Sequence, residues 1–158
     1  MDGRPVRESV SEYAELALPN DTNALGTLLG GKVMHLVDMA GAMAAMRHAR
    51  STVVTASVDY MTFLHPVRVG QLVILRSSVN RAFHSSMEVG VKVFVEDLLT
   101  REMRHTSSAY LTFVAIDAQG KRVPVVPVIP ETEEEKRRYA EAGERRNHRL
   151  ALKKRSCE

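Results

Sequence analysis

The sequence contains a single cysteine, Cys157, next to the last of its 158 residues. One cysteine cannot form a disulfide within the chain, so the composition favours a reducing, cytoplasmic setting. A thiol in a charged tail also lacks the packed surroundings that orient a catalytic nucleophile. We interpret Cys157 as an incidental tail thiol.

Long apolar runs are absent as well. No stretch approaches the roughly 20 apolar residues that span a bilayer, and residues 1–5 lack the apolar segment of a secretory signal peptide. Apolar residues still make up 44% of the chain, which is enough for one domain with a real hydrophobic core. The sequence therefore predicts a globular domain without a membrane partner.

Several signatures of hydrolytic and nucleotide chemistry are missing or incomplete. There is no Gly-x-Ser-x-Gly elbow of a serine hydrolase, and the histidines show no metal-ligand spacing, so no metal site is expected. Gly26–Lys32 fits G-x-x-x-x-G-K, but Val33 stands where a phosphate-binding loop needs Ser or Thr. A hydrolase built on this chain would have to activate water with a carboxylate and polarise its substrate with backbone dipoles.

The net charge of +3 is small, but basic residues concentrate in the last fifth of the chain. Acidic residues are interspersed there and no aromatic platform accompanies them, so a solvated helix is favoured over a nucleic-acid contact. Thr132 and Glu135 form a capping-box pattern that predicts the start of this helix. The pairs Glu133–Arg137 and Glu134–Arg138 are spaced to support it.

Residue patterns predict one long helix and five strands. Lys32–Ala49 is apolar nearly all round, which at this length predicts a buried helix. The predicted strands are Ser9–Leu18, Thr52–Phe63, Val67–Val79, Ser86–Val95 and His105–Ile116. The last four follow one another without helices between them, so the sheet should be antiparallel. One helix covers only one face of such a sheet, and association with another subunit is therefore expected.

Three features stand out as candidate functional groups. Asp38 is the only carboxylate of the apolar helix, and a charge there is costly unless it is paired or functional. Alternatively, Asp38 belongs to a polar stripe that faces water, because Lys32 and His35 precede it at spacings of three residues. Gly30-Gly31 lets backbone N–H groups at the helix start approach a developing oxyanion. Asn23, in the preceding polar loop, is a turn former or a functional group.

A series of short motifs follows the order of the predicted elements. They are Asp21–Gly26, Gly30-Gly31, Asp38–Ala40, Arg47-His48, Val53–Asp59, Phe63, Pro66-Val67, Val69-Gly70 and Thr112–Asp117. Together they resemble the hotdog acyl-CoA thioesterases, in the branch of brain-type acyl-CoA hydrolase and its small bacterial relatives. The resemblance covers about residues 9–130.

The resemblance implies an α+β hotdog fold. A curved antiparallel sheet would wrap around one long buried helix in residues 1–130, and a charged helical extension would occupy residues 131–158. Two subunits would join their sheets edge to edge. A homo-oligomer is expected, with a dimer as the minimum unit and a hexamer of three dimers as the assembly.

The resemblance also implies a thioesterase of lipid metabolism that hydrolyses acyl-CoA to free CoA and a carboxylic acid. It assigns catalysis to Asn23 from one subunit and Asp38 from its neighbour. Asp38 would act as general base on water or as nucleophile, and N–H groups around Gly30 and Gly31 would stabilise the oxyanion. CoA enters only as part of the substrate, with no other cofactor. The residues expected to bind CoA are Arg81, Ser85, Ser86 and Lys92.

Two other functions are open on the same fold. A non-catalytic acyl-CoA sensor is the main alternative, although a pure binder has no need of a carboxylate such as Asp38 facing a thioester. A hotdog dehydratase would require a His or Asp pair in a motif that this sequence lacks.

Overall fold

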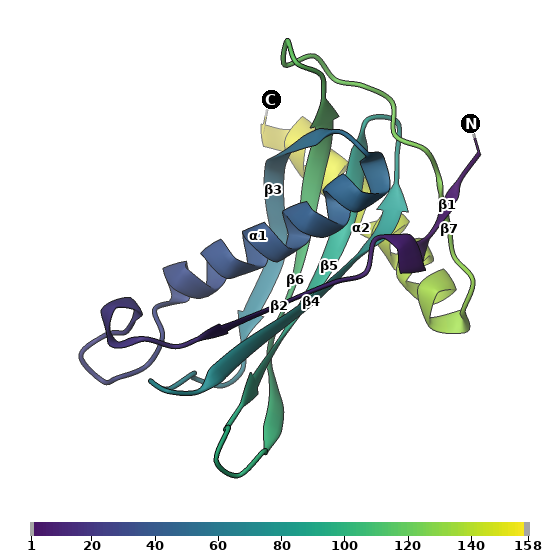
Figure 1. Ribbon diagram of the computed structural model, residues 1–158. Helices are drawn as coiled ribbons and strands as arrows, with labels where there is room; N and C mark the ends of the chain where they lie inside the picture. The colour runs from purple at the N-terminus through teal and green to yellow at the C-terminus, as the bar shows by residue number, and fades with distance from the viewer. Residues whose placement is uncertain (1, 157–158) are drawn as a thin grey trace.

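The computed structural model describes residues 2–156 (Figure 1), so Cys157 lies outside the described residues. Five strands form one sheet in the order β2-β4-β5-β6-β3, with every neighbouring pair antiparallel. The strands are β2 (Ser11–Leu16), β3 (Thr52–Phe63), β4 (Leu72–Ala82), β5 (Ser86–Glu96) and β6 (Met103–Ile116). The antiparallel sheet predicted from the uninterrupted run of strands is confirmed.

Short elements complete the chain between these strands. β1 (Arg4–Pro5) and β7 (Val128–Ile129) form a small parallel pair near the two ends of the domain. Two single-turn 3-10 helices, η1 (Val6–Glu8) and η2 (Pro19–Asp21), flank β2. The latter leads into the loop that carries Asn23.

The long helix α1 (Gly30–Ala49) crosses one face of the sheet, which we call the inner face (Figure 1). Its buried side consists of small and branched apolar residues, and Gly41 lets it approach β6 closely. A Cβ at Gly41 would lie only 3.0 Å from the ring of Phe113. The opposite side of α1 is open in a single subunit, where Met34 and Met46 are 45% and 43% exposed. The helix is therefore buried against the sheet on one side only.

β4 begins later than its β-branched residues suggest. Gly70 has φ +88°, a left-handed conformation that suits glycine, and its N–H donates to the carbonyl of Ala17. This turn breaks the predicted strand Val67–Val79, so that β4 starts at Leu72. Gly70 thus marks a turn rather than a bend within the strand.

β3 lies at an edge of the sheet, because its only strand partner among the described residues is β6. It is 12 residues long, and Val54, Val58 and Tyr60 on it are 45%, 43% and 59% exposed. Two irregularities interrupt its register, between Thr55 and Ser57 and between Val58 and Tyr60. A long, apolar, unpaired edge is a surface on which another strand can pair.

The second long helix, α2 (Glu133–Ser156), lies on the other face of the sheet, which we call the outer face (Figure 1). The predicted capping box is present, since the Glu135 N–H donates to Thr132 Oγ1 and the Thr132 N–H to Glu135 Oε2, both at 3.1 Å. The predicted Glu134–Arg138 pair forms at 2.7 Å. The Glu133–Arg137 pair does not form, because Arg137 pairs instead with Glu134 at 3.8 Å and Glu141 at 3.3 Å. No helix within residues 2–156 has the length and apolar character needed to cross a membrane.

Candidate functional site

Asn23 organises the exposed loop before α1. Its side-chain oxygen accepts hydrogen bonds from the N–H groups of Leu25 (2.9 Å) and Thr27 (3.2 Å), and its Nδ2 donates to Thr27 Oγ1 (2.8 Å). Gly26 closes the loop with φ +77°. Asn23 is therefore a turn-forming residue within one subunit, and its amide sits at the molecular surface beside the start of α1.

Asp38 lies in the third turn of α1 and is half-buried. Its Oδ1 accepts a hydrogen bond of 2.6 Å from the hydroxyl of Thr55 on β3. Within residues 2–156, Asp38 forms no ion pair, and Lys32 pairs instead with Glu15 at 3.1 Å and Asp21 at 3.6 Å. The helix thus presents a carboxylate without a counter-ion, fixed by one hydroxyl.

The charge of Lys32 is balanced by Glu15 and Asp21, which precede α1, and not by Asp38. Its ammonium bond to Glu15 raises the Lys32 pKa. The same carboxylate accepts a hydrogen bond of 2.6 Å from Tyr13 Oη, and this bond is the main cause that lowers the Glu15 pKa. These contacts account for Lys32 as a stabilising residue at the helix start. Lys32 does not pair with Asp38, so a polar stripe along α1 does not account for Asp38.

The first turn of α1 is open to ligands. Leu29 is the N-cap and provides no side-chain cap, and both Gly30 and Gly31 are exposed. Backbone N–H groups at a helix start carry partial positive charge that favours an anion or oxyanion. A cleft of about 290 Å³ opens beside this turn. It is lined by Leu28, Gly30, Val33, Phe63, Leu64, His65, Pro66, Val67, Thr106 and Ser107.

One subunit does not assemble the predicted catalytic pair. The side chain of Asn23 bonds only within its own loop, that of Asp38 bonds to Thr55, and neither residue lines the cleft beside Gly30. Thr55 was not among the site residues predicted from the sequence. The signal was present, because Thr55 lies inside the Val53–Asp59 motif, but its contact with Asp38 depends on how β3 packs against α1.

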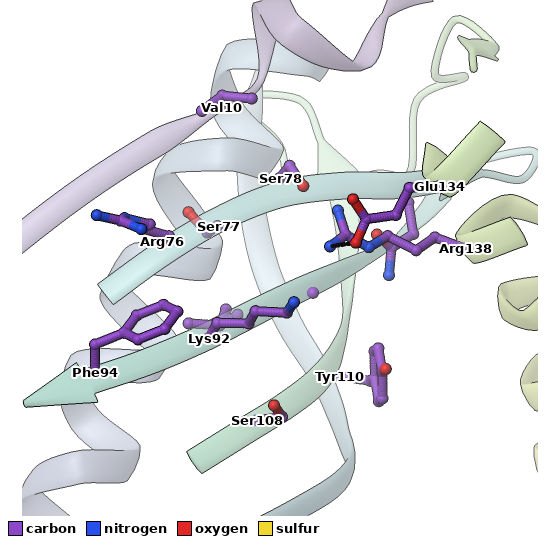
Figure 2. Close-up of a pocket in the computed structure, with 13 residues that line it drawn as sticks. Val10, Arg76, Ser77, Ser78, Lys92, Phe94, Ser108, Tyr110, Glu134 and Arg138 are labelled. Carbon is purple, nitrogen blue, oxygen red and sulfur yellow. Dashed lines mark hydrogen bonds and ion pairs between the residues drawn. The ribbon is translucent and has the colours of Figure 1, made fainter. Parts of the chain in front are cut away.

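The four residues expected to bind CoA are not brought together in one subunit. Arg81 lies under α2, 4.1 Å from the ring centroid of Tyr139, and donates to the Tyr139 carbonyl at 3.3 Å. Ser85 and Ser86 lie at the β4–β5 turn. Lys92 is exposed on the outer face, in a groove of about 350 Å³ beside Tyr110 (Figure 2). Their roles stay predictions.

The groove in Figure 2 is separate from the cleft at the helix start. Lys92 of β5 and Tyr110 of β6 line it together, and Glu134 and Arg138 of α2 stand at one end. Within residues 2–156, no group of three or more His, Cys, Asp or Glu side chains could hold a metal ion.

Residues 25–101 match the thioesterase superfamily. The chain is 43% identical over 150 residues to a Bacillus subtilis protein described as an uncharacterized acyl-CoA thioester hydrolase, YkhA, covering 95% of this chain and 87% of that protein. A crystal structure of an apo-hexameric acyl-CoA thioesterase is 44% identical, with a TM-score of 0.92, covering 99% of this chain and 98% of that one.

The acyl-CoA hydrolase of Staphylococcus aureus has been solved with butyryl-CoA, CoA and CoA disulfide. It is 37% identical, with a TM-score of 0.90, and the alignment covers 97% of this chain and 93% of that one. Variants of the same enzyme carry alanine in place of an asparagine, an aspartate or a threonine. The shared fold and the identity across nearly the whole chain show that this protein belongs to the thioesterase superfamily, among its hotdog-fold acyl-CoA thioester hydrolases.

Proposed function

We propose that the protein hydrolyses acyl-CoA thioesters at a site shared by two subunits. The observation that carries this proposal is Asp38, the only carboxylate of α1, which has no counter-ion among residues 2–156 and is held by the hydroxyl of Thr55 at 2.6 Å. A carboxylate that is held in place and is not paired with a cation can take a proton from water.

The proposed reaction begins with the thioester carbonyl oxygen against the N–H groups of Gly30 and Gly31. Asp38 takes a proton from water, whose oxygen attacks the carbonyl carbon, and the helix start stabilises the oxyanion. Collapse of the tetrahedral intermediate breaks the C–S bond, and the CoA thiolate recovers the proton. In the alternative route Asp38 attacks the carbonyl carbon directly, the C–S bond breaks to release the CoA thiolate, and water then hydrolyses the resulting anhydride. Asn23 orients the water or the carbonyl.

The Staphylococcus aureus variants support these roles. The asparagine, aspartate and threonine replaced there are spaced along that chain as Asn23, Asp38 and Thr55 are spaced here. That enzyme binds butyryl-CoA and CoA, so a CoA thioester is the substrate class that we propose. A relative from rat is named a cytosolic acyl coenzyme A thioester hydrolase, which supports a cytoplasmic location.

The assembly that we propose completes the site. Asn23 and Asp38 share no contact within one subunit, and the β3 edge is available for pairing with a second β3. Edge-to-edge pairing would bring the loop of one subunit toward the helix of the other. Relatives solved as hexamers support three such dimers as the complete particle.

The direct test replaces Asp38 and measures CoA thiol release from a series of acyl-CoA substrates. Asp38→Ala is expected to lower kcat at least ~100-fold, the contribution of a general base. Glu12→Gln, on an exposed carboxylate of β2, is the matched control and is expected to keep full activity. Full activity of Asp38→Ala would refute the assignment, and stoichiometric acyl-CoA binding without thiol release would identify a sensor.

Subunit sharing has its own test. Asn23→Ala and Asp38→Ala chains are produced separately, mixed, unfolded and refolded together. In a mixed dimer, one site combines both altered residues and the other combines both original ones, so random pairing restores about one quarter of the wild-type activity. No recovery would place both residues in one subunit's site.

A further inference from the structure

Thr55 and Ser57 of β3 point to opposite faces of the sheet although they are two residues apart. Thr55 faces α1, since it bonds to Asp38 and pairs with Phe113, whose ring lies against Gly41. Ser57 pairs with Thr112, and both hydroxyls face the outer side. In a regular strand such residues would share a face. The register shift between them is therefore what aims Thr55 at the helix.

Asp59 ties this irregular part of β3 together on the outer face. Its Oδ1 accepts a hydrogen bond from Ser57 Oγ at 2.8 Å, and its Oδ2 accepts one from Thr112 Oγ1 at 3.0 Å. Asp59 lies at the second register shift, between Val58 and Tyr60. The Asp59 carboxylate thus joins Ser57, which follows the first register shift, to Thr112 of β6.

The C-terminal helix completes the anchor. Arg149 of α2 donates to Asp59 Oδ2 at 3.1 Å, and the Asp59 side chain is only 12% exposed. One turn earlier, Arg145 forms two hydrogen bonds, of 3.0 and 2.7 Å, with the buried Glu88. Arg149 is therefore presented by a helix that is already fixed to the sheet.

We propose that Asp59 is a positioning residue for the thioesterase reaction and that Arg149 of α2 holds it in place. The chain of contacts runs from Arg149 to Asp59, across the irregular part of β3, and through Thr55 to Asp38. A slip of one residue in β3 would turn Thr55 away from the helix, because side chains alternate between faces. The C-terminal helix thereby keeps the base of the active site oriented. This inference rests on the proposed function of Asp38.

The test is a double-mutant cycle between Arg149→Ala and Thr55→Val, read as kcat and KM for one acyl-CoA. Arg149→Ala is expected to lower kcat about 10-fold and to change KM less than about twofold, since orientation rather than binding is lost. In the Thr55→Val background the same change should have less than about a twofold effect. Arg149→Lys, which retains a cation for Asp59, should recover most of the activity.

The matched control is Arg137→Ala. It removes another arginine of α2, one whose ion pairs lie within the helix and 59% of whose side chain is exposed, and it should leave kcat unchanged. Hydrogen exchange of the amides of residues 55–60 gives a readout without substrate, and Arg149→Ala should accelerate it at least about 10-fold.

Three outcomes would overturn the inference. They are full activity of Arg149→Ala, equal losses from Arg149→Ala with and without the Thr55→Val substitution, and unchanged exchange in β3. An inactive wild-type chain would instead overturn the proposed function itself, and the exchange measurement on β3 would still show whether α2 anchors the strand.

Discussion

Removing the guanidinium of Arg145 should free α2 from the sheet. Glu88 is 1% exposed, and its carboxylate accepts hydrogen bonds from Arg145 and, at 3.0 Å, from Asn80 Nδ2. Arg145→Ala leaves this carboxylate buried with a single neutral donor. The side chain also stacks at 3.7 Å on the ring of Tyr110, and that contact is lost as well.

The expected cost follows from breaking one side of a buried ion pair, which is about 3–5 kcal/mol. Folded domains are stable by only about 5–15 kcal/mol, so the loss is large. Because α2 can leave the sheet and admit water to Glu88, the loss should appear in the docking of α2 before the sheet unfolds. Exchange protection of the α2 amides should fall by more than about 100-fold.

Two further variants separate the ion pair from mere packing. Glu88→Gln combined with Arg145→Met removes both charges and keeps similar volumes, so it should cost less than Arg145→Ala alone. Hydrogen exchange and urea unfolding followed by circular dichroism measure both. A loss below about 1 kcal/mol in Arg145→Ala, or a double variant worse than the single one, would show that the pair does not hold the helix.

Three other substitutions test separate parts of the fold. Burial lowers the pKa of His48 below its usual 6.5. The contribution of His48 to stability is therefore present above pH 6.5 and declines as the pH falls below that value, by up to ~1.4 kcal/mol per pH unit. His48→Gln should flatten this slope in thermal unfolding between about pH 5 and 8. Gly41→Val should destabilise the domain by about 1–3 kcal/mol in urea, because the Phe113 ring leaves no room, and a neutral result would contradict the close packing of α1. Thr132→Ala should cost about 1 kcal/mol and speed exchange in the first turn of α2, whereas unchanged exchange would show that the cap is not needed.

The His48 prediction depends on its surroundings. His48 is fully buried, its Nε2 lies 2.8 Å from the Val126 carbonyl, and its Nδ1 has no partner among the described residues. A second proton would sit on that nitrogen, and no acceptor among the described residues lies within hydrogen-bond distance of it. Protonation therefore favours the unfolded chain, which gives the sign of the pH dependence.

The order of elements was predictable from local patterns. Apolar residues all round Lys32–Ala49, alternation in β5 and the Thr132–Glu135 capping box each specify structure within a few residues of themselves. Strand ends were less predictable, as the turn at Gly70 shows. Local chemistry does not reveal whether a glycine bends a strand or ends it.

The site was predictable only in part. Asp38 stood out because a lone carboxylate on an apolar helix is costly, but Asn23 was assigned from the resemblance. The Thr55–Asp38 bond and the Asp59–Arg149 pair join residues 17 and 90 positions apart. Both contacts depend on how β3 pairs with β6, including its two register shifts, and no short motif encodes that pairing.

On the outer face of the sheet, α2 covers the carboxylates of Glu88 and Asp59 and the ring of Tyr110, and Ala142 is the only buried residue of that helix. If the whole segment from residue 131 onward were removed, water would solvate Glu88 and Asp59 in place of the arginines. Because α2 can also leave the sheet in Arg145→Ala, losing the entire extension should leave a sheet about as stable as the one in that variant. The segment could therefore be lost, lengthened or exchanged in evolution without changes to the core, and the proposed effect of α2 on Asp38 could change while the fold stays the same.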